Sequence, residues 1–211
     1  MPVEVKICGL STPETMDAAL AAGADLVGLV FFPASPRHVS LDQAASLAER
    51  ARGKARIVAL VVDAGDAAIA EINLMVRPDL YQAHGDETPE RIAAIAALTG
   101  KPIIKVIKVK DAADLAHASA YAGKAALIHY DAKTPAGTLP GGMGIAFDWP
   151  LLRGTPGVYM LGGGLTPANV AEAIRASGAA MVDVSSGVES APGVKDAGLI
   201  RKFIEAAKSA S

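Results

Sequence analysis

The chain has 211 residues, a length that suits one globular domain and just reaches that of a single β/α barrel. It is 51% hydrophobic and 20% charged with a formal net charge of −2, so the composition provides a large core and argues against a nucleic-acid partner. No apolar run is long enough to span a bilayer, we find no signal peptide, and the single cysteine rules out an internal disulfide, so we expect a cytoplasmic protein without membrane contact.

Short aliphatic segments alternate with alanine-rich segments along the whole chain. The aliphatic segments predict eight strands, at residues 3–8, 26–31, 56–62, 80–83, 103–108, 125–130, 158–161 and 181–184. The segments between them predict helices at 13–22, 41–52, 66–75, 89–98, 112–121, 167–176 and 195–207, with a short helix at 147–153. Strands that alternate with helices are expected to be parallel, and their nearly continuous apolar character indicates a sheet covered on both faces.

Eight such units in a chain of this length predict an α/β fold, a closed TIM-type (β/α)8 barrel with outer helices, as a single domain over residues 1–211. An open doubly wound sheet often carries a glycine-rich nucleotide-binding turn after its first strand. Here that position holds Cys8-Gly9-Leu10, which does not fit such a turn. A barrel places its active site at the carboxyl ends of the strands, so the residues that follow each strand are the informative ones.

The first predicted strand ends with Lys6 and Cys8 on the same face, because side chains alternate along a strand. A thiol acts as a base only as the thiolate, and the ammonium of Lys6 is expected to lower the pKa of Cys8 and favour that form. Cys8 is therefore a candidate catalytic residue. The alternative is a small buried hydrophobic side chain, which is the commonest state of a free cysteine.

Two further candidates follow the second and fourth strands. Arg37 lies in a loop stiffened by Pro33 and Pro36, and a fixed guanidinium suits bidentate binding of a carboxylate. The alternative is a solvated surface arginine. His84 could polarise a substrate group, or it could satisfy a backbone group of the protein itself.

Asp131 lies at the carboxyl end of the sixth predicted strand and precedes the glycine- and proline-rich stretch 133–144. A carboxylate in this place is a general-acid candidate, and the stretch after it is expected to be a functional loop over one end of the barrel. The alternative is a loop carboxylate that accepts a hydrogen bond from a backbone amide. Strands one and six lie apart around the barrel mouth, so Cys8 and Asp131 could approach a ligand from different sides, which suits an isomerisation.

Glycines and small hydroxyl residues follow the seventh and eighth strands, at 161–167 and 183–189. Backbone amides at a helix start bind anions, and glycine allows a phosphate to approach closely. Many barrels bind phosphate with these two loops, so their occurrence together predicts a phosphate site. The alternative is a pair of tight turns.

Six segments, taken in chain order, resemble the phosphoribosylanthranilate isomerase family. They are Lys-Ile-Cys-Gly-Leu at 6–10, Phe-Pro-Ala-Ser-Pro-Arg at 32–37, Gln-Ala-His-Gly at 82–85, Gly-Gly-Met-Gly with Phe-Asp-Trp at 141–149, Gly-Gly-Gly-Leu-Thr-Pro-Ala-Asn-Val at 162–170, and Asp-Val-Ser-Ser-Gly-Val-Glu with Pro-Gly-Val-Lys-Asp at 183–196. The resemblance covers essentially the whole chain. It implies a barrel that acts on a small-molecule phosphosugar without a cofactor or metal, and we expect a monomer or homodimer.

The resemblance implies an Amadori rearrangement of N-(5′-phosphoribosyl)anthranilate into the 1-deoxyribulose phosphate derivative, in tryptophan biosynthesis. Asp131 would be the general acid that protonates the furanose ring oxygen, and Cys8 the general base that then removes a proton from the neighbouring sugar carbon. Arg37 would hold the anthranilate carboxylate, with His84 and Asp183 as further substrate contacts. Backbone amides would hold the phosphate, near Gly163, Gly164, Ser186 and Gly187.

The chain departs from the family pattern just before Asp131 and in the loop after it. His129 and Tyr130 stand where aliphatic residues are usual, and Gly162 where alanine is common. Polar residues of the pattern are replaced within the loop by Met143, Ile145 and Ala146. These changes put a hydroxyl contact from this loop in doubt and leave the acid, the base and the phosphate loops untouched.

Three other functions compete with this one. A histidine-pathway isomerase would pair two aspartates at strand ends and show a two-half repeat, which we do not find. An indole-glycerol-phosphate synthase would use a lysine, for which Lys105 and Lys108 are candidates, but it is usually longer. A non-catalytic sensor of phosphate ligands would keep the glycine loops and need neither Cys8 nor Asp131, so conversion of fresh substrate would distinguish it from an enzyme.

Overall fold

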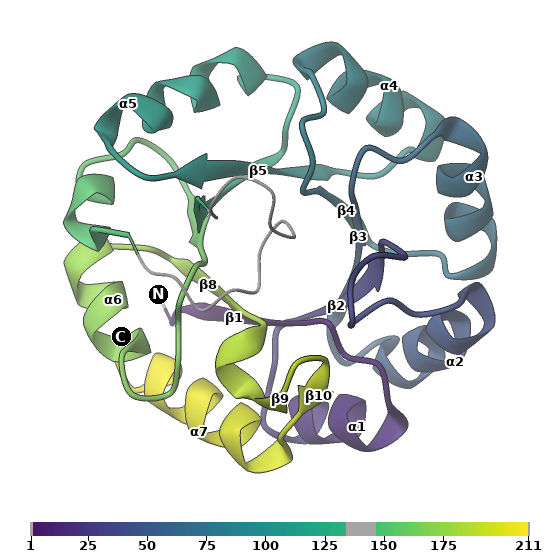
Figure 1. Cartoon of the computed structure of the whole chain (residues 1–211), viewed down its shortest axis with the longest axis horizontal. Helices are drawn as coiled ribbons and strands as arrows, with labels where there is room; N and C mark the ends of the chain where they lie inside the picture. Colours follow the sequence, from purple (N-terminus) through teal and green to yellow (C-terminus); the bar gives the residue numbers. More distant parts are fainter. Residues whose placement is uncertain (1, 134–146, 211) are drawn as a thin grey trace.

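The computed structural model of the chain describes residues 2–133 and 147–210, and it contains a closed barrel of eight parallel strands inside a ring of helices (Figure 1). The strands pair in chain order, and β1 also pairs with β8, which closes the barrel. This confirms the predicted TIM-type (β/α)8 fold. The predicted loop at 133–144 lies outside the described residues from 134 on, as do Ile145 and Ala146. The barrel strands are β1 (Glu4–Cys8), β2 (Leu26–Phe31), β3 (Arg56–Val61), β4 (Leu80–Ala83), β5 (Ile103–Val109), β6 (Leu127–Ala132), β7 (Tyr159–Leu161) and β8 (Met181–Val184).

The helices lie outside the barrel between successive strands (Figure 1). Thr12, Ser40 and Thr88 each precede a helix and accept a hydrogen bond from the amide three residues further on, which stabilises the helix start. The helix that follows Thr88 ends at Thr99, and the next residue, Gly100, has a φ of 66°, which favours glycine. The helical elements are α1 (Pro13–Ala21), α2 (Leu41–Ala51), α3 (Asp66–Met75), α4 (Pro89–Thr99), α5 (Ala112–Leu115), η1 (Ala116–Tyr121), η2 (Trp149–Leu152), α6 (Val170–Ser177), η3 (Ser186–Val188) and α7 (Ala197–Lys208).

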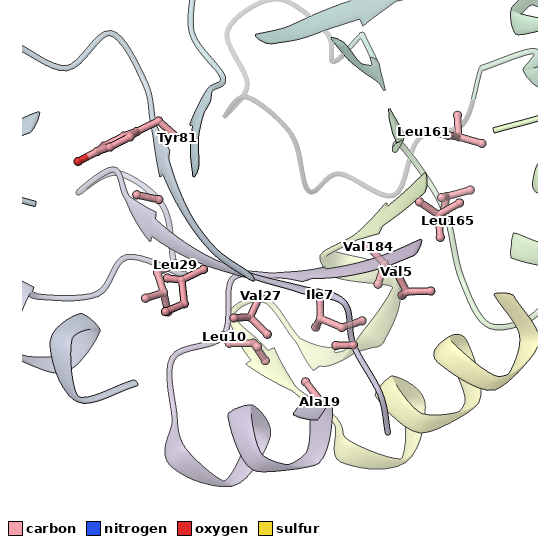
Figure 2. Close-up of a cluster of buried hydrophobic side chains, with 14 of the residues drawn as sticks. Val5, Ile7, Leu10, Ala19, Val27, Leu29, Tyr81, Leu161, Leu165 and Val184 are labelled. Carbon is pink, nitrogen blue, oxygen red and sulfur yellow. The ribbon is translucent and has the colours of Figure 1, made fainter. Parts of the chain in front are cut away.

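Alternate residues of each strand face opposite sides of the barrel wall. Outward-facing side chains pack against the helices in one large core, and Figure 2 shows Ile7, Leu10 and Val27 gathered with Ala19 of α1. Inward-facing side chains form two smaller apolar clusters, one of Leu26, Val58, Ile104, Met160 and Met181 toward the amino ends of the strands, and one of Cys8, Val30 and Leu60 toward their carboxyl ends. Other positions that face the interior carry buried polar side chains, and these side chains define the candidate site.

Several predicted elements have different bounds in the structure. β6 runs over Leu127–Ala132 rather than 125–130, because its pairing with β5 continues to Ala132. α6 begins at Val170 rather than at 167, because Asn169 accepts a hydrogen bond from the amide of Thr166 and forms a turn there. The helix predicted at 112–121 is a single α-helical turn that continues as a 3-10 helix.

A β-hairpin that the sequence did not reveal follows β8. Its strands are β9 (Glu189–Ala191) and β10 (Val194–Lys195), and Gly193 between them has a φ of 81°. Lys195 therefore lies in a strand, and the prediction of a helix beginning at 195 was wrong. The helix α7 begins two residues later, where Asp196 accepts a hydrogen bond from the amide of Leu199.

Candidate active site

Buried polar side chains fill the barrel interior toward the carboxyl ends of the strands. They are Lys6 and Cys8 of β1, Gln82 of β4 with His84 just after it, His129 and Asp131 of β6, and Asp183 of β8. Lys6 Nζ and Asp183 Oδ1 form a salt bridge of 2.9 Å. His84 Nε2 lies 3.4 Å from Asp131 Oδ2, and His129 Nε2 lies 3.8 Å from Asp183 Oδ2. Close polar groups therefore connect β1 with β8, β8 with β6, and β6 with the end of β4.

Cys8 faces the interior on the same side of β1 as Lys6, as predicted, and both are almost fully buried. Gly28 on β2 leaves room for them, because a Cβ there would lie 2.9 Å from Cys8 Sγ and 3.2 Å from Lys6 Nζ. Burial raises the pKa of Cys8 above its usual 9.0, although Lys6 acts in the opposite direction. Lys6 thus lowers the pKa of Cys8 as expected, but burial and the nearby Asp183 carboxylate outweigh it, so the thiolate is not favoured overall.

Asp131 lies within β6 and points into the interior beside His84. Burial disfavours its charged form, but the neighbouring imidazoles of His84 and His129 and the backbone amide of Ala132 outweigh this and hold its pKa below the usual 3.8. The Ala132 amide donates to Oδ1 at 2.9 Å, so the carboxylate does accept from the backbone as well as facing the site. His84 also contacts Gln82, whose Nε2 lies 3.2 Å from His84 Nδ1.

Arg37 is held in place by a glutamate from the hairpin that follows β8. Its Nε and Nη2 donate to the two carboxylate oxygens of Glu189, at 2.7 Å and 2.8 Å. Lys195 donates to the same carboxylate at 2.6 Å. Burial opposes ionisation of Glu189, but Arg37 and Lys195 hold its pKa below the usual value. The Arg37 side chain is only 11% exposed, so it is not a solvated surface arginine.

The Arg37 stem also lies against the loop that follows β1. Gly9 has a φ of 79°, and a Cβ there would lie 2.7 Å from Arg37 Cδ. Among the described residues Nη1 of Arg37 has no hydrogen-bond partner, whereas Nε and Nη2 are both used. The sequence identified Arg37 but missed Glu189 and Lys195, although their charges six residues apart after the eighth strand were a usable signal.

The two predicted phosphate loops come together in the structure. Gly163 and Gly164 follow β7 with φ values of 83° and 66°, and their amides donate to no acceptor among the described residues. Ser186 and Gly187 form the first two residues of η3, whose amides have no partner within the helix. A Cβ on Gly187 would collide with the carbonyl oxygen of Leu165 in the other loop, so glycine is needed for this close packing.

The two lysines of the alternative synthase hypothesis lie on β5. Lys105 Nζ pairs with Glu87 at 2.8 Å and donates to the carbonyl of Gly85, and both charged side chains are buried. Lys105 Nζ is thus held in a buried structural ion pair and is not positioned as the lysine that the synthase hypothesis requires. Lys108 forms a more exposed pair with Asp86. Within residues 2–133 and 147–210, no three His, Cys, Asp or Glu side chains are grouped so that they could hold a metal ion.

Comparison with known proteins gives one consistent result. The family model described as N-(5'phosphoribosyl)anthranilate (PRA) isomerase matches residues 5–206. An N-(5'-phosphoribosyl)anthranilate isomerase of Rhodopseudomonas palustris (strain BisA53) is 57% identical over 99% of this chain and 97% of its own length.

Solved structures agree with the sequence comparisons. A phosphoribosyl anthranilate isomerase from Thermotoga maritima has 35% identity and a TM-score of 0.88, and the match covers 98% of this chain and 99% of the other. A phosphoribosyl anthranilate isomerase in complex with reduced 1-(o-carboxyphenylamino)-1-deoxyribulose 5-phosphate has 33% identity and a TM-score of 0.86 over the same shares of the two chains.

Proposed function

This chain belongs to the N-(5′-phosphoribosyl)anthranilate isomerase family, and from that premise we propose the part that each site residue takes in the reaction. The enzyme isomerises N-(5′-phosphoribosyl)anthranilate to 1-(2-carboxyphenylamino)-1-deoxyribulose 5-phosphate, a step of tryptophan biosynthesis. Asp131 protonates the furanose ring oxygen, and the ring opens to a Schiff base. Cys8 then removes the proton from the neighbouring sugar carbon, and the resulting enolamine tautomerises to the ketone.

The resting protonation states of this pair are the reverse of those that the reaction needs. The raised pKa of Cys8 favours the thiol, and the lowered pKa of Asp131 favours the carboxylate. The pair therefore shares one proton, and this proton lies on Cys8, the proposed base. A turnover also ends in this state, because Asp131 has given up a proton and Cys8 has gained one. The active form carries the single proton on Asp131 instead. Because both forms hold one proton, the fraction of the active form does not change with pH between the pKa of Asp131 and the pKa of Cys8.

Arg37 and the two glycine loops bind the charged ends of the substrate in this proposal. The unused Nη1 of Arg37 is available to the anthranilate carboxylate, while the bidentate pair with Glu189 fixes the guanidinium plane. Asp183 and His84 contact the sugar near the amine. The phosphate accepts hydrogen bonds from backbone amides on the two loops, those of Gly163, Gly164, Ser186 and Gly187.

The remaining proposals concern the working form of the protein. We propose a cytoplasmic enzyme, because its single cysteine must stay reduced to act as a base. We further propose that residues 1–211 act as one domain, as a monomer or homodimer, and bind neither nucleic acid nor membranes. Within the described ranges, no helix is long and apolar enough to cross a bilayer.

The observation that carries the proposal is that Cys8 and Asp131 face the same barrel interior from β1 and β6. We expect Cys8→Ser and Asp131→Asn each to lower kcat by about 10²–10⁴-fold, the usual contribution of a positioned acid or base. The assay is the loss of fluorescence of the anthranilate conjugate, with thermal unfolding measured in parallel to show that each variant is folded. A folded variant with wild-type turnover would remove that residue from the mechanism.

The control replaces an exposed histidine on the outer surface. His117→Leu changes a residue of η1 that is exposed, so turnover should remain at the wild-type level. Ligand binding without conversion by the wild-type protein would instead indicate a sensor of phosphate ligands.

A further inference from the structure

His129 is a buried imidazole to which the proposed mechanism assigns no part. It faces the barrel interior from β6, two residues before Asp131, and is 1% exposed. Neither Nδ1 nor Nε2 has a hydrogen-bond partner among the described residues. Burial lowers its pKa to about 4, so at neutral pH the ring is uncharged and carries one N–H donor and one acceptor nitrogen. Buried polar groups without partners are rare in native proteins, so this ring calls for an explanation.

Gly162 makes the space that the imidazole edge occupies. A Cβ at this position would overlap His129 Nε2 and would lie 3.4 Å from Asp131 Oδ1. The absent side chain therefore allows Nε2 to lie against the Gly162 backbone, beside the proposed acid. Gly162 lacks the positive φ of the next two glycines, so the backbone conformation alone does not require glycine here.

The charges around Nε2 favour one of the two ring nitrogens as the site of the proton. Asp183 uses Oδ1 for its salt bridge with Lys6, and its Oδ2 faces His129 Nε2 at 3.8 Å. A lone pair on Nε2 would face the carboxylates of Asp183 and Asp131 and be repelled, whereas an N–H there is attracted. Catalytic hydrogen bonds are often long before substrate binds and shorten in the complex.

We propose that His129 is a positioning residue of the isomerase, which carries its proton on Nε2 and donates it to Oδ2 of Asp183. Lys6 and His129 then hold the Asp183 carboxylate from both oxygens, so that it presents one fixed orientation to the substrate. The inference rests on the proposed function, in which Asp183 contacts the sugar near the amine.

The test compares two replacements that differ in one hydrogen bond. His129→Leu keeps an apolar side chain of similar size and should lower kcat by about tenfold, the order expected when one hydrogen bond to a charged group is lost. KM should change little, since the ring does not itself hold the phosphate or the carboxylate. His129→Gln places its amide nitrogen near the position of Nε2 and should restore most of kcat, while His129→Asn, whose shorter amide does not reach that position, should not.

Gly162→Ala provides an independent test of the same contact. The added Cβ should displace the imidazole and reduce kcat as His129→Leu does, and it should add no further loss in the His129→Leu background. If Gly162→Ala instead acts through the neighbouring Gly163–Gly164 loop, KM should rise equally in both backgrounds, and the contact that we infer is absent.

Asp183→Asn separates a failure of this inference from a failure of the proposed function. Wild-type turnover in Asp183→Asn would remove Asp183 from the mechanism, and the inference with it. A slow Asp183→Asn beside a fully active His129→Leu would overturn the inference alone. Should His129→Leu fail to fold, the comparison of His129→Gln with His129→Asn tests the inference instead. Equal activities of these two variants would exclude a hydrogen-bond donor at Nε2.

Discussion

At Cys8 the surroundings act against the chemistry that the residue is proposed to perform. Lys6 lies on the same face but is paired with Asp183, and burial keeps the thiol protonated. Asp131 shows the opposite shift, because its neighbours stabilise the carboxylate. In the proposed mechanism, the most populated form of the free enzyme is therefore inactive, and the smaller fraction with the proton on Asp131 would carry the reaction.

This arrangement predicts how the thiol titrates. Cys8 is the only cysteine, so the ultraviolet absorbance of the thiolate in the wild type minus that of Cys8→Ser reports its pKa directly. We expect a midpoint above 9.0, and kcat/KM should fall on the alkaline side over the same range because the pair then loses its single proton. A thiolate that forms well below 9.0 would show that Lys6 dominates and that the resting state is not reversed.

Glu189 predicts a second effect at the level of single residues. Glu189→Gln places an amide group against the N–H donors of Arg37 and Lys195 and loses the bidentate pair. We expect KM to rise on the order of tenfold, with a smaller change in kcat, because Arg37 loses its fixed orientation. Asp17→Asn breaks an exposed pair with Arg50 and serves as the control with unchanged kinetics. An unchanged KM in Glu189→Gln would show that Glu189 does not orient Arg37 for substrate.

The candidate residues were predictable from the sequence, but their partners were not. Strand alternation placed Cys8 and Lys6 on one face correctly, and the positions after strands identified Arg37 and Asp131. The sequence could not show that Asp183, 177 residues from Lys6, neutralises that ammonium, or that Glu189, 152 residues from Arg37, binds the guanidinium. Such contacts depend on how the barrel closes, and together with burial they shift the pKa values of Cys8 and Glu189.

Among the elements, the hairpin after β8 connects two parts of the fold near the proposed site. Gly193 allows its turn and donates its amide to Glu189 Oε2 at 3.1 Å. A Cβ on Gly193 would lie 2.6 Å from the carbonyl oxygen of Pro36, next to Arg37. The hairpin thus packs directly on the loop whose arginine it holds.

Gly193→Ala is expected to weaken both stability and substrate binding. The side chain meets a positive φ and the Pro36 carbonyl, so the loss of unfolding free energy should exceed the strain of the φ angle alone, and KM should rise. Gly53→Ala isolates the strain, because Gly53 has a φ of 76° with nothing near its Cβ position; it should cost about 1 kcal/mol and leave KM unchanged. Equal effects on stability and KM in the two variants would show that the hairpin is not coupled to the site.

The types of the elements were predicted well where the hydrophobic pattern is long. They were predicted less well where an element is only two or three residues long. The strands at 26–31, 80–83 and 181–184 and the helix at 66–75 have the predicted bounds. The hairpin was missed because its two strands are three and two residues long, which is too short for a periodic pattern. Lys195 was consequently predicted to begin a helix, although it lies in the hairpin and forms a buried ion pair with Glu189.

For the molecule as a whole, we expect the buried pair of Lys105 and Glu87 to contribute to the free energy of unfolding but not to turnover. Lys105→Met leaves the Glu87 carboxylate unpaired and should lower the free energy of unfolding by about 3 kcal/mol, as measured by denaturant unfolding. Turnover of the folded variant should be unchanged. Lys124→Met breaks the exposed pair with Glu90 and should cost less than about 1 kcal/mol.

The same pair predicts the direction of acid destabilisation. Burial opposes ionisation of Glu87, but Lys105 and the backbone amides hold its pKa below the usual 4.5. Its contribution to stability is therefore present above pH 4.5 and is lost as the pH falls through the folded-state pKa. Lys105→Met should show a shallower loss over this range, and an unchanged pH profile would show that Glu87 does not control it.

The closed barrel itself was predictable because eight aliphatic segments alternate with helices in the sequence. The two sides of its wall differ: outward side chains pack against the helices, and inward side chains near the carboxyl ends include the proposed acid and base. Along β1 the two sides alternate: Val5 and Ile7 pack in the outer core, and Lys6 and Cys8 face the interior, where the proposed site lies. A new activity could therefore arise in such a chain by exchanging every second residue of a strand, with the scaffold inherited unchanged.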